Sequence, residues 1–413
     1  MPTKRGWSAF AAGLAFWIAA RFIGSDDLHM VAVGLTVLPF LAALFVQWNR
    51  VRLDIHRHLS APRVHAGARV VVALDIANQG SITTPFLLLE DALSPALGKP
   101  ARLVVAGVPP GSRQRVSYSV VTRHRGRYTI GPLSISISDP FGLARVRVQA
   151  TSTNDLIVYP AVEGLEAWTL GMQGVGAGES TVRQLFHSAA EFYTMREYVT
   201  GDDLRRIHWP SVARTGHLMI RQDESNRRSM ATIFLDNRVG AMGGDASPGF
   251  EKGVSVTASI GRLLIQAGFA VHLATLDREP TPVSETILLE TLASVTTVRT
   301  SGMGESLTRL RSAARSDTSL ALVTAPPQGA ELAAMTRIGT GFGRKLAVLV
   351  YPVSPSALPE EARTEVETRA SVARGTLVHG GWEVFVISPD GRLAELWRSS
   401  RRSRKLQVAG SLS

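Results

Sequence analysis

Two long apolar stretches near the start of the chain dominate its hydrophobic pattern. The first runs from Trp7 to Ile23, with Arg21 as its one charged residue, and the second runs from Leu28 to Val46. Each is close to the shortest helix that crosses a hydrocarbon core of about 30 Å. Because the second stretch follows the first almost directly, residues 1–50 are predicted to form a transmembrane helical hairpin rather than a cleaved signal peptide.

Positive charge flanks this predicted hairpin on one side only. The flanking cations are Lys4, Arg5, Arg50, Arg52 and Arg57, whereas Asp26 and Asp27 lie between the two stretches. Short loops that stay in the cytoplasm carry an excess of Lys and Arg. We therefore expect a protein of the cell inner or plasma membrane with both termini cytoplasmic.

The pattern then changes to short runs of alternating apolar and polar residues, in a predicted domain at 51–160. RVVVALDIA (Arg69–Ala77) and SISIS (Ser134–Ser138) are examples, and turn residues separate the runs. About seven strands with turns at this spacing predict an immunoglobulin-like β-sandwich. In its turns, we expect Phe141 to pack inward and Arg125 to be solvated.

Apolar runs alternate with amphipathic stretches between residues 229 and 400. Met230–Asp236 (MATIFLD) has the composition of a strand that is buried on both faces, and four similar runs follow. This pattern predicts an α/β doubly wound, mostly parallel sheet. Residues 161–228 are then a linker with a dense motif, and 401–413 form a basic tail. Asp236, Asp277 and residues 324–328 are expected at the carboxyl ends of strands, where such sheets bind ligands.

Composition removes several kinds of site. The chain has no cysteine, which excludes disulfides, thiolate metal sites and cysteine nucleophiles. Its formal net charge of +11 is spread along the chain without a nucleic-acid motif, so we expect membrane lipid rather than nucleic acid as a partner. The chain lacks the Gly-x-x-x-x-Gly-Lys-Ser/Thr pattern of a phosphate-binding loop, and we expect no cofactor.

The dense motif reads R-x-Y-x-x-G-D-x-x-R-x-I-x-W-x-x-x-A-R-x-G-x-L, with a glutamate shortly after it. Its residues are Arg196, Tyr198, Gly201, Asp202, Arg205, Ile207, Trp209, Ala213, Arg214, Gly216, Leu218 and Glu224. This segment closely resembles the signature of a bacterial family called domain of unknown function 58. The resemblance extends over nearly the whole chain, including RGRYTIGP (Arg125–Pro132) and DPFGL (Asp139–Leu143).

The chemistry of the motif leaves two interpretations open. Asp202 could cap a helical turn, and Ile207 and Trp209 could anchor the segment against the sheet, so that the motif only braces two domains. Alternatively, its arginines form a docking surface that grips partner carboxylates. His208 and His217 are lone histidines without a recognisable nucleophile nearby, which makes catalysis the weakest interpretation.

The resemblance also implies a von Willebrand factor A-like fold for residues 229–400. Many such domains hold a divalent metal with D-x-S-x-S after the first strand and an aspartate after a later strand. Here the first strand ends in Asp236-Asn237-Arg238-Val239-Gly240, and the later one in Thr324-Ala325-Pro326. Only Asp236 matches, and a hard cation needs several oxygen ligands. We therefore expect a degenerate site without metal.

Family resemblance finally implies partners. Members are often encoded beside MoxR-type AAA+ ATPases and transglutaminase-like membrane proteins. The chain is therefore expected to be no enzyme but a membrane-anchored scaffold or adaptor that docks such an ATPase in envelope or complex assembly. Two alternatives remain: a metal-dependent von Willebrand factor A-type binding module that uses Asp236, and an unrecognised hydrolase that uses Asp202, Asp203 and His208.

Overall fold

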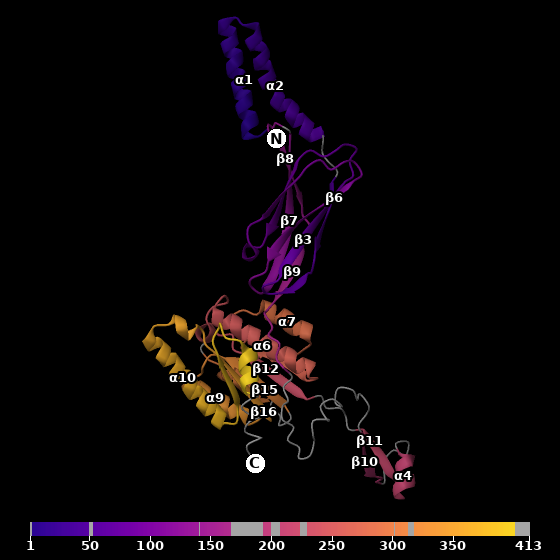
Figure 1. Ribbon diagram of the computed structural model, residues 1–413, viewed down its shortest axis with the longest axis vertical. Helices are drawn as coiled ribbons and strands as arrows, with labels where there is room; N and C mark the ends of the chain where they lie inside the picture. Colours follow the sequence, from indigo (N-terminus) through magenta and orange to yellow (C-terminus); the bar gives the residue numbers. More distant parts are fainter. Residues whose placement is uncertain are drawn as a thin grey trace. The chain divides into compact units, whose positions relative to one another are not determined.

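The computed structural model describes residues 2–48, 53–139, 141–166, 193–199, 207–223, 229–300, 302–312 and 318–400. The chain divides into two compact units (Figure 1). Unit 1 comprises residues 1–162 and 286–296, and unit 2 comprises residues 163–285 and 297–413. The chain therefore leaves unit 2 at residue 286 and returns to it at residue 297.

Unit 1 begins with the predicted helical hairpin. Helices α1 (Lys4–Ile23) and α2 (Asp26–Trp48) lie side by side and are both long and apolar enough to cross a membrane (Figure 1). A 20-residue helix such as α1 rises by about 30 Å, which equals the thickness of a typical hydrocarbon core. The prediction of two apolar helices is confirmed.

Small residues allow the two helices to approach closely. A Cβ atom on Gly13 would lie 2.5 Å from Thr36 Oγ1 and 2.8 Å from the Thr36 backbone nitrogen. Nearer the start of α1, the rings of Phe10 and Phe40 pack edge to face with centroids 5.5 Å apart. Close packing around small residues is the usual way in which apolar helices associate in lipid.

Two sheets follow the hairpin. The three-stranded sheet has the order β1-β3-β6, and the six-stranded sheet has the order β2-β9-β7-β4-β5, with β8 also paired to β7. The strands are β1 (Leu53–Leu59), β2 (Arg63–His65), β3 (Arg69–Asn78), β4 (Leu87–Leu93), β5 (Ala101–Val105), β6 (Arg113–Val121), β7 (Gly126–Ser138), β8 (Arg145–Ala150) and β9 (Asn154–Tyr159). The predicted β-rich middle region is confirmed.

Alternating side chains of the two sheets share an apolar core. Val70 and Val72 of β3 pack with Leu156 and Val158 of β9. A second apolar cluster, formed by other side chains of both sheets, also contains Val46 of α2, which is fully buried. The last turns of α2 therefore pack in the same apolar cluster as side chains of both sheets.

A buried ion pair also joins the two sheets. Arg57 of β1 donates from Nε and Nη2 to Asp91 of β4, at 3.0 and 2.6 Å, and Tyr118 of β6 donates to the same carboxylate at 2.6 Å. Burial, and then the bond to Asp91, raise the pKa of Tyr118. Arg57, one of the cations that flank the hairpin in the sequence, is therefore buried in the fold, where Asp91 balances its charge.

Helix α7 (Glu285–Ser294) belongs to unit 1 from residue 286 onward, although it is flanked in sequence by unit 2. Arg125 donates from Nε to the carbonyl of Leu292, at 2.9 Å, and from Nη2 to that of Val295, at 2.8 Å. Cations stabilise the carboxyl end of a helix. The expectation of a solvated Arg125 is wrong, because these carbonyls bury it.

The DPFGL turn lies against the start of α1. Asp139 Oδ1 accepts from the amide of Ala144 at 2.5 Å, and Asp139 Oδ2 accepts from that of Phe141 at 2.9 Å. Leu143 is buried in the core, whereas Phe141 is 66% exposed. The expectation that Phe141 packs inward is therefore wrong, since Leu143 takes the inward position.

Unit 2 contains the predicted parallel sheet. Its order is β14-β13-β12-β15-β16-β17, and every neighbouring pair is parallel except β13 and β14. The strands are β12 (Met230–Leu235), β13 (Ala270–Thr275), β14 (Thr281–Val283), β15 (Thr318–Thr324), β16 (Arg344–Val350) and β17 (Glu383–Ile387). The α/β pattern is confirmed, whereas the short antiparallel strand β14 was not predicted.

Helices cover both faces of this sheet. Helix α6 (Pro248–Gln266) contacts strands from β13 to β16 on one face. On the other face, α8 (Gly304–Ser312), α9 (Gly329–Gly339) and α10 (Glu360–His379) enclose an apolar cluster that includes Phe234. A strand buried on both faces needs apolar residues throughout, which explains the continuous run in β12.

Candidate functional site

The strand order changes direction between β12 and β15, and polar residues gather at that point. β12 and β15 are neighbours, yet the chain continues from β12 to β13 on one side and from β15 to β16 on the other. Ligands of doubly wound sheets bind at the carboxyl ends of the strands at this position. Asp236 and Arg238 follow β12 directly, and Thr324 ends β15.

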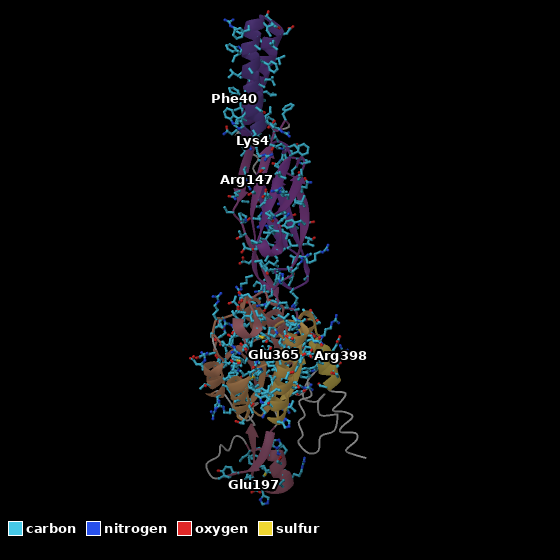
Figure 2. All side chains as sticks on the ribbon, turned by 90° about the vertical axis from the view of Figure 1, so that its left-hand side faces the viewer. Lys4, Phe40, Arg147, Glu197, Glu365 and Arg398 are labelled. Carbon is cyan, nitrogen blue, oxygen red and sulfur yellow. The ribbon has the colours of Figure 1, made fainter. Side chains whose placement is uncertain are left out.

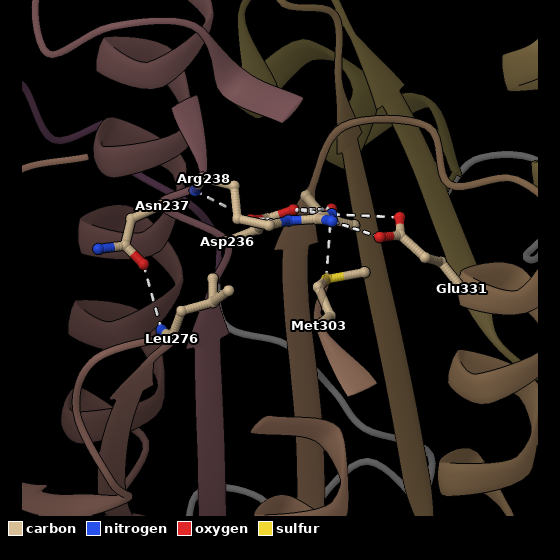
Figure 3. A network of polar contacts seen from close by, with 7 residues as sticks. Asp236, Asn237, Arg238, Leu276, Met303 and Glu331 are labelled. Atoms are coloured by element: carbon tan, nitrogen blue, oxygen red, sulfur yellow. Dashed lines mark hydrogen bonds and ion pairs between the residues drawn. The ribbon is translucent and has the colours of Figure 1, made fainter. Parts of the chain in front are cut away.

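The guanidinium of Arg238 places a positive charge at this point (Figure 3). Arg238 donates from Nε to Asp236 Oδ1 at 3.0 Å and from Nη2 to Asp236 Oδ2 at 2.8 Å. The other edge of the guanidinium contacts Glu331, which lies in the first turn of α9 and accepts from both Nη1 and Nη2. The Asp236 side chain is fully buried and that of Arg238 is 8% exposed.

Charge balance keeps the guanidinium ionised. Burial disfavours the charged form of Arg238, but the hydrogen bonds that Arg238 donates to Asp236 and Glu331 outweigh burial and raise the pKa of Arg238. Two carboxylates around one guanidinium leave a formal charge of −1, which the amino end of α9 helps to stabilise on the partly exposed Glu331.

The acceptor capacity of Asp236 is filled. Besides the two guanidinium bonds, the backbone amide of Arg238 donates to Oδ1 at 3.1 Å and Thr324 Oγ1 donates to Oδ2 at 2.7 Å. A carboxylate offers about four lone-pair directions, and these four donors use them. A divalent cation could bind Asp236 only after displacing Arg238.

A second polar group adjoins the first. Asn237 accepts from the amide of Leu276 at 3.1 Å and donates from Nδ2 to Asp277 Oδ1 at 3.0 Å (Figure 3 shows the first of these bonds). Thr275 also donates to Asp277, at 2.7 Å. Burial raises the pKa of Asp277, but the hydrogen bonds from Thr275 and Asn237 outweigh burial and lower it. Asn237 therefore connects the ends of β12 and β13.

Sequence reasoning located part of this site. It placed Asp236, Asp277 and Thr324 at the carboxyl ends of the strands, and the structure brings Thr324 into contact with Asp236. It missed Glu331, which approaches Arg238 from 93 positions away. The available signal was an acidic residue in the first turn of the helix that follows β15.

The motif segment forms two antiparallel strands and a short helix. Strands β10 (Tyr193–Glu197) and β11 (Met219–Asp223) are antiparallel, with Arg196 opposite Ile220. The ladder continues with the amide of Tyr198, which donates to the carbonyl of Leu218 at 2.8 Å. Helix α4 (Trp209–Thr215) follows His208, whose amide donates to the carbonyl of Met219 at 2.9 Å.

Several of the predicted motif residues are described in this segment. Gly216 ends α4 with a φ of 76°, which favours glycine, and its amide donates to the carbonyl of Val212. Trp209 is 66% exposed, and Leu218, Ala213 and Arg214 are also exposed, whereas Ile207 and Tyr198 are half-buried. Gly201, Asp202, Arg205 and Glu224 lie outside the described residues, as does the side chain of Arg196.

One local expectation for the motif is wrong. Trp209 is exposed rather than buried against the sheet, because it occupies the first position of a short, exposed helix. The residue before α4 is His208, and the capping role expected of Asp202 falls on a residue outside the described part of the chain. His208 also has a hydroxyl beside it, since its Nδ1 lies 2.9 Å from Ser211 Oγ. Asp202 and Asp203, which the hydrolase alternative requires, lie outside the described residues.

Comparison with known proteins supports the resemblance over part of the chain. Residues 194–368 match the family described as "Protein of unknown function DUF58". The chain is also 24% identical over 253 residues to a protein of Bacillus subtilis (strain 168) named "Uncharacterized protein YeaD". That match covers 59% of this chain and 61% of the relative, which is less than two thirds of the relative's length.

Solved structures give only distant likenesses. A CARDB domain of the PF1109 protein from Pyrococcus furiosus has 13% identity and a TM-score of 0.21, over 26% of this chain and 93% of that one. The alkylpurine DNA glycosylase AlkC of Pseudomonas fluorescens has 10% identity and a TM-score of 0.19, over 34% of this chain and 42% of that one. Such low scores carry no argument about fold or function.

Proposed function

We propose that this chain is a membrane-anchored, non-catalytic scaffold that docks a MoxR-type AAA+ ATPase. Helices α1 and α2 anchor it in the bacterial inner or plasma membrane, with both termini cytoplasmic. The sheets of unit 1 form an immunoglobulin-like module, and unit 2 is a von Willebrand factor A-like domain that works without a metal. A transglutaminase-like membrane protein is a second partner under this proposal.

The bond between Arg238 and Asp236 is the observation that carries this proposal. In a metal-dependent binding domain, a cation at the carboxyl end of the first strand binds a carboxylate of the partner. Here the positive charge belongs to Arg238, and Asp236 and Glu331 already neutralise it. Binding through a shared metal is thereby disfavoured, so the partner contacts are expected elsewhere.

The motif segment offers such a contact surface. Trp209 and Leu218 are exposed apolar side chains, and the exposed Arg214 belongs to the same helix as Trp209. Trp and Arg are the residues most enriched among those that dominate binding energy at protein interfaces. This composition supports the docking interpretation of the motif over the bracing one.

Copurification tests the proposed function. The full-length protein is purified from its native membrane in mild detergent, and the copurifying proteins are identified by mass spectrometry. We expect an AAA+ ATPase that is lost with Trp209→Ala/Leu218→Ala and with Arg205→Glu. Val372→Ala, which alters an exposed apolar residue of α10, should retain it. Failure to recover an ATPase from crosslinked membranes would refute the proposal.

A further inference from the structure

The end of unit 1 that meets the helical hairpin carries exposed apolar and basic side chains. Leu87 pairs with Ile137, so the residue before it, Phe86, lies at the same end of the sheet as the DPFGL turn. Phe86 and Phe141 are both exposed. Exposed apolar side chains that gather on one surface are a feature of membrane-interaction sites.

Hydrogen bonds fix the distance between this turn and α1. The Thr3 amide donates to the carbonyl of Leu143 at 2.8 Å, and Thr3 Oγ1 donates to that of Gly142 at 2.7 Å. Thr3 also caps α1 by accepting from the amide of Gly6. Since α1 begins at Lys4 and is as long as a hydrocarbon core is thick, the turn lies at the depth of the lipid headgroups when α1 spans a bilayer.

Four cations lie around the turn. Lys4 and Arg5 begin α1, and Arg145 and Arg147 begin β8, which contacts α2. All four side chains are exposed, and Figure 2 shows Lys4 at the base of the hairpin with Arg147 on the adjoining part of the sheet. Lys and Arg at this depth are attracted to the phosphates of anionic lipids.

We propose that the DPFGL turn is a second membrane contact, in which Phe141 enters the headgroup region of an anionic bilayer. Lys4, Arg5, Arg145 and Arg147 bind lipid phosphates around it. The surface therefore holds the soluble part of unit 1 against the bilayer at a fixed depth. This inference rests on the membrane anchor of the proposed function and adds a lipid-binding site to it.

Single-cysteine labelling tests the inference in the full-length protein, which contains no cysteine of its own. Phe141→Cys carries an environment-sensitive fluorophore, and the protein is reconstituted in vesicles of phosphatidylethanolamine and phosphatidylglycerol that contain a spin-labelled quencher lipid. The matched control is Val121→Cys, which is 44% exposed and lies at the other end of β6 from Arg113. Eight residue steps place these two ends about 27 Å apart.

We expect the label at Phe141→Cys to be quenched at least about twofold more strongly than that at Val121→Cys, because interfacial apolar side chains are buried about 5–10 Å into the boundary between headgroups and acyl chains. Arg145→Glu/Arg147→Glu should reduce this quenching in anionic vesicles. Arg123→Glu/Arg127→Glu, which alters two exposed arginines near the opposite end of unit 1, should leave it unchanged.

Flotation of the vesicles separates the two proposals. Protein that floats with the vesicles but shows equal quenching at both positions overturns the lipid contact and leaves the anchor intact. Equal quenching of Phe141→Cys in purely zwitterionic vesicles, unaffected by Arg145→Glu/Arg147→Glu, overturns the role of anionic lipid. Protein that does not float overturns both the anchor and the lipid contact.

Discussion

Arg238 donates to both carboxylate oxygens of Asp236, a residue only two positions earlier in the chain. Arg238 has extended backbone that forms an isolated parallel bridge with Val298, and its guanidinium reaches back to the carboxylate that precedes it. A positive charge is thereby built into the polypeptide at the point where a doubly wound sheet usually receives a ligand.

Arg238→Ala should destabilise unit 2 strongly. Removal of one partner leaves Asp236 as an uncompensated buried charge, which costs about 3–5 kcal/mol. For a domain of this size, that corresponds to a fall in Tm of roughly 6–20 °C. Thermal unfolding of the full-length protein in detergent measures it. The double variant Asp236→Asn/Arg238→Met should recover most of the loss, and a single variant as stable as the wild type would contradict the buried ion pair.

Arg238→Ser should create a cation site. The substitution restores the first serine of the D-x-S pattern and frees the oxygens of Asp236 and Glu331, which are ligands that Mg²⁺ prefers. At a Mg²⁺ concentration of ten times Kd, binding would stabilise the variant by about 1.4 kcal/mol. Thermal shift and calorimetry measure this effect. The wild type should show neither a shift nor heat, and a wild-type response would favour the metal-dependent alternative.

Asp277 should make stability depend on pH in acid. Its pKa is lowered from the ordinary value of 3.8, so its contribution is fully present above that value and is lost as pH falls through the lower folded-state pKa. Asp277→Asn should therefore lower Tm at pH 7 and converge on the wild type only once the pH has fallen below the folded-state pKa. Tm measured against pH tests this, with Glu279→Gln as a control on an exposed neighbour. Parallel curves for wild type and Asp277→Asn would be the contrary result.

Gly13→Leu should separate the two apolar helices. Its side chain would collide with Thr36, both at the hydroxyl and at the backbone, and the collision cannot be relieved by moving a flexible side chain alone. Disulfide formation between Phe10→Cys and Phe40→Cys, whose rings are in contact, reports the packing. We expect slower crosslinking with Gly13→Leu and an unchanged rate with Gly34→Leu, where a Cβ meets nothing within 4 Å.

The elements predicted best were those whose burial can be recognised from their own residues alone. β12 and β15 are buried along nearly their whole length, so their apolar runs were sufficient. Strand β1 was missed because LDIHRHL carries polar side chains at most of its positions. β14 has only three residues at the sheet edge, too few for a period to be recognised.

The burial of single charged residues could not be predicted from the sequence, because it depends on partners far away in the chain. Arg57 is buried by Asp91, 34 positions away, and Arg125 by the carbonyl of Leu292, 167 positions away. No local pattern contains those partners. The Arg238 site was partly predictable, because Asp236 is two positions away in the sequence. The contact with Glu331 depends on the tertiary fold and could not be predicted from neighbouring residues.

The position of α7 in unit 1 has a consequence for synthesis. Leu292, which Arg125 needs as an acceptor, is translated 167 residues after Arg125. At about 5–20 residues per second, the sheets of unit 1 wait roughly 8–33 s for the helix that completes them. During this time the part of unit 1 around Arg125 is not yet covered by α7. A gene truncated after residue 162 should therefore yield an aggregation-prone product rather than an independent module.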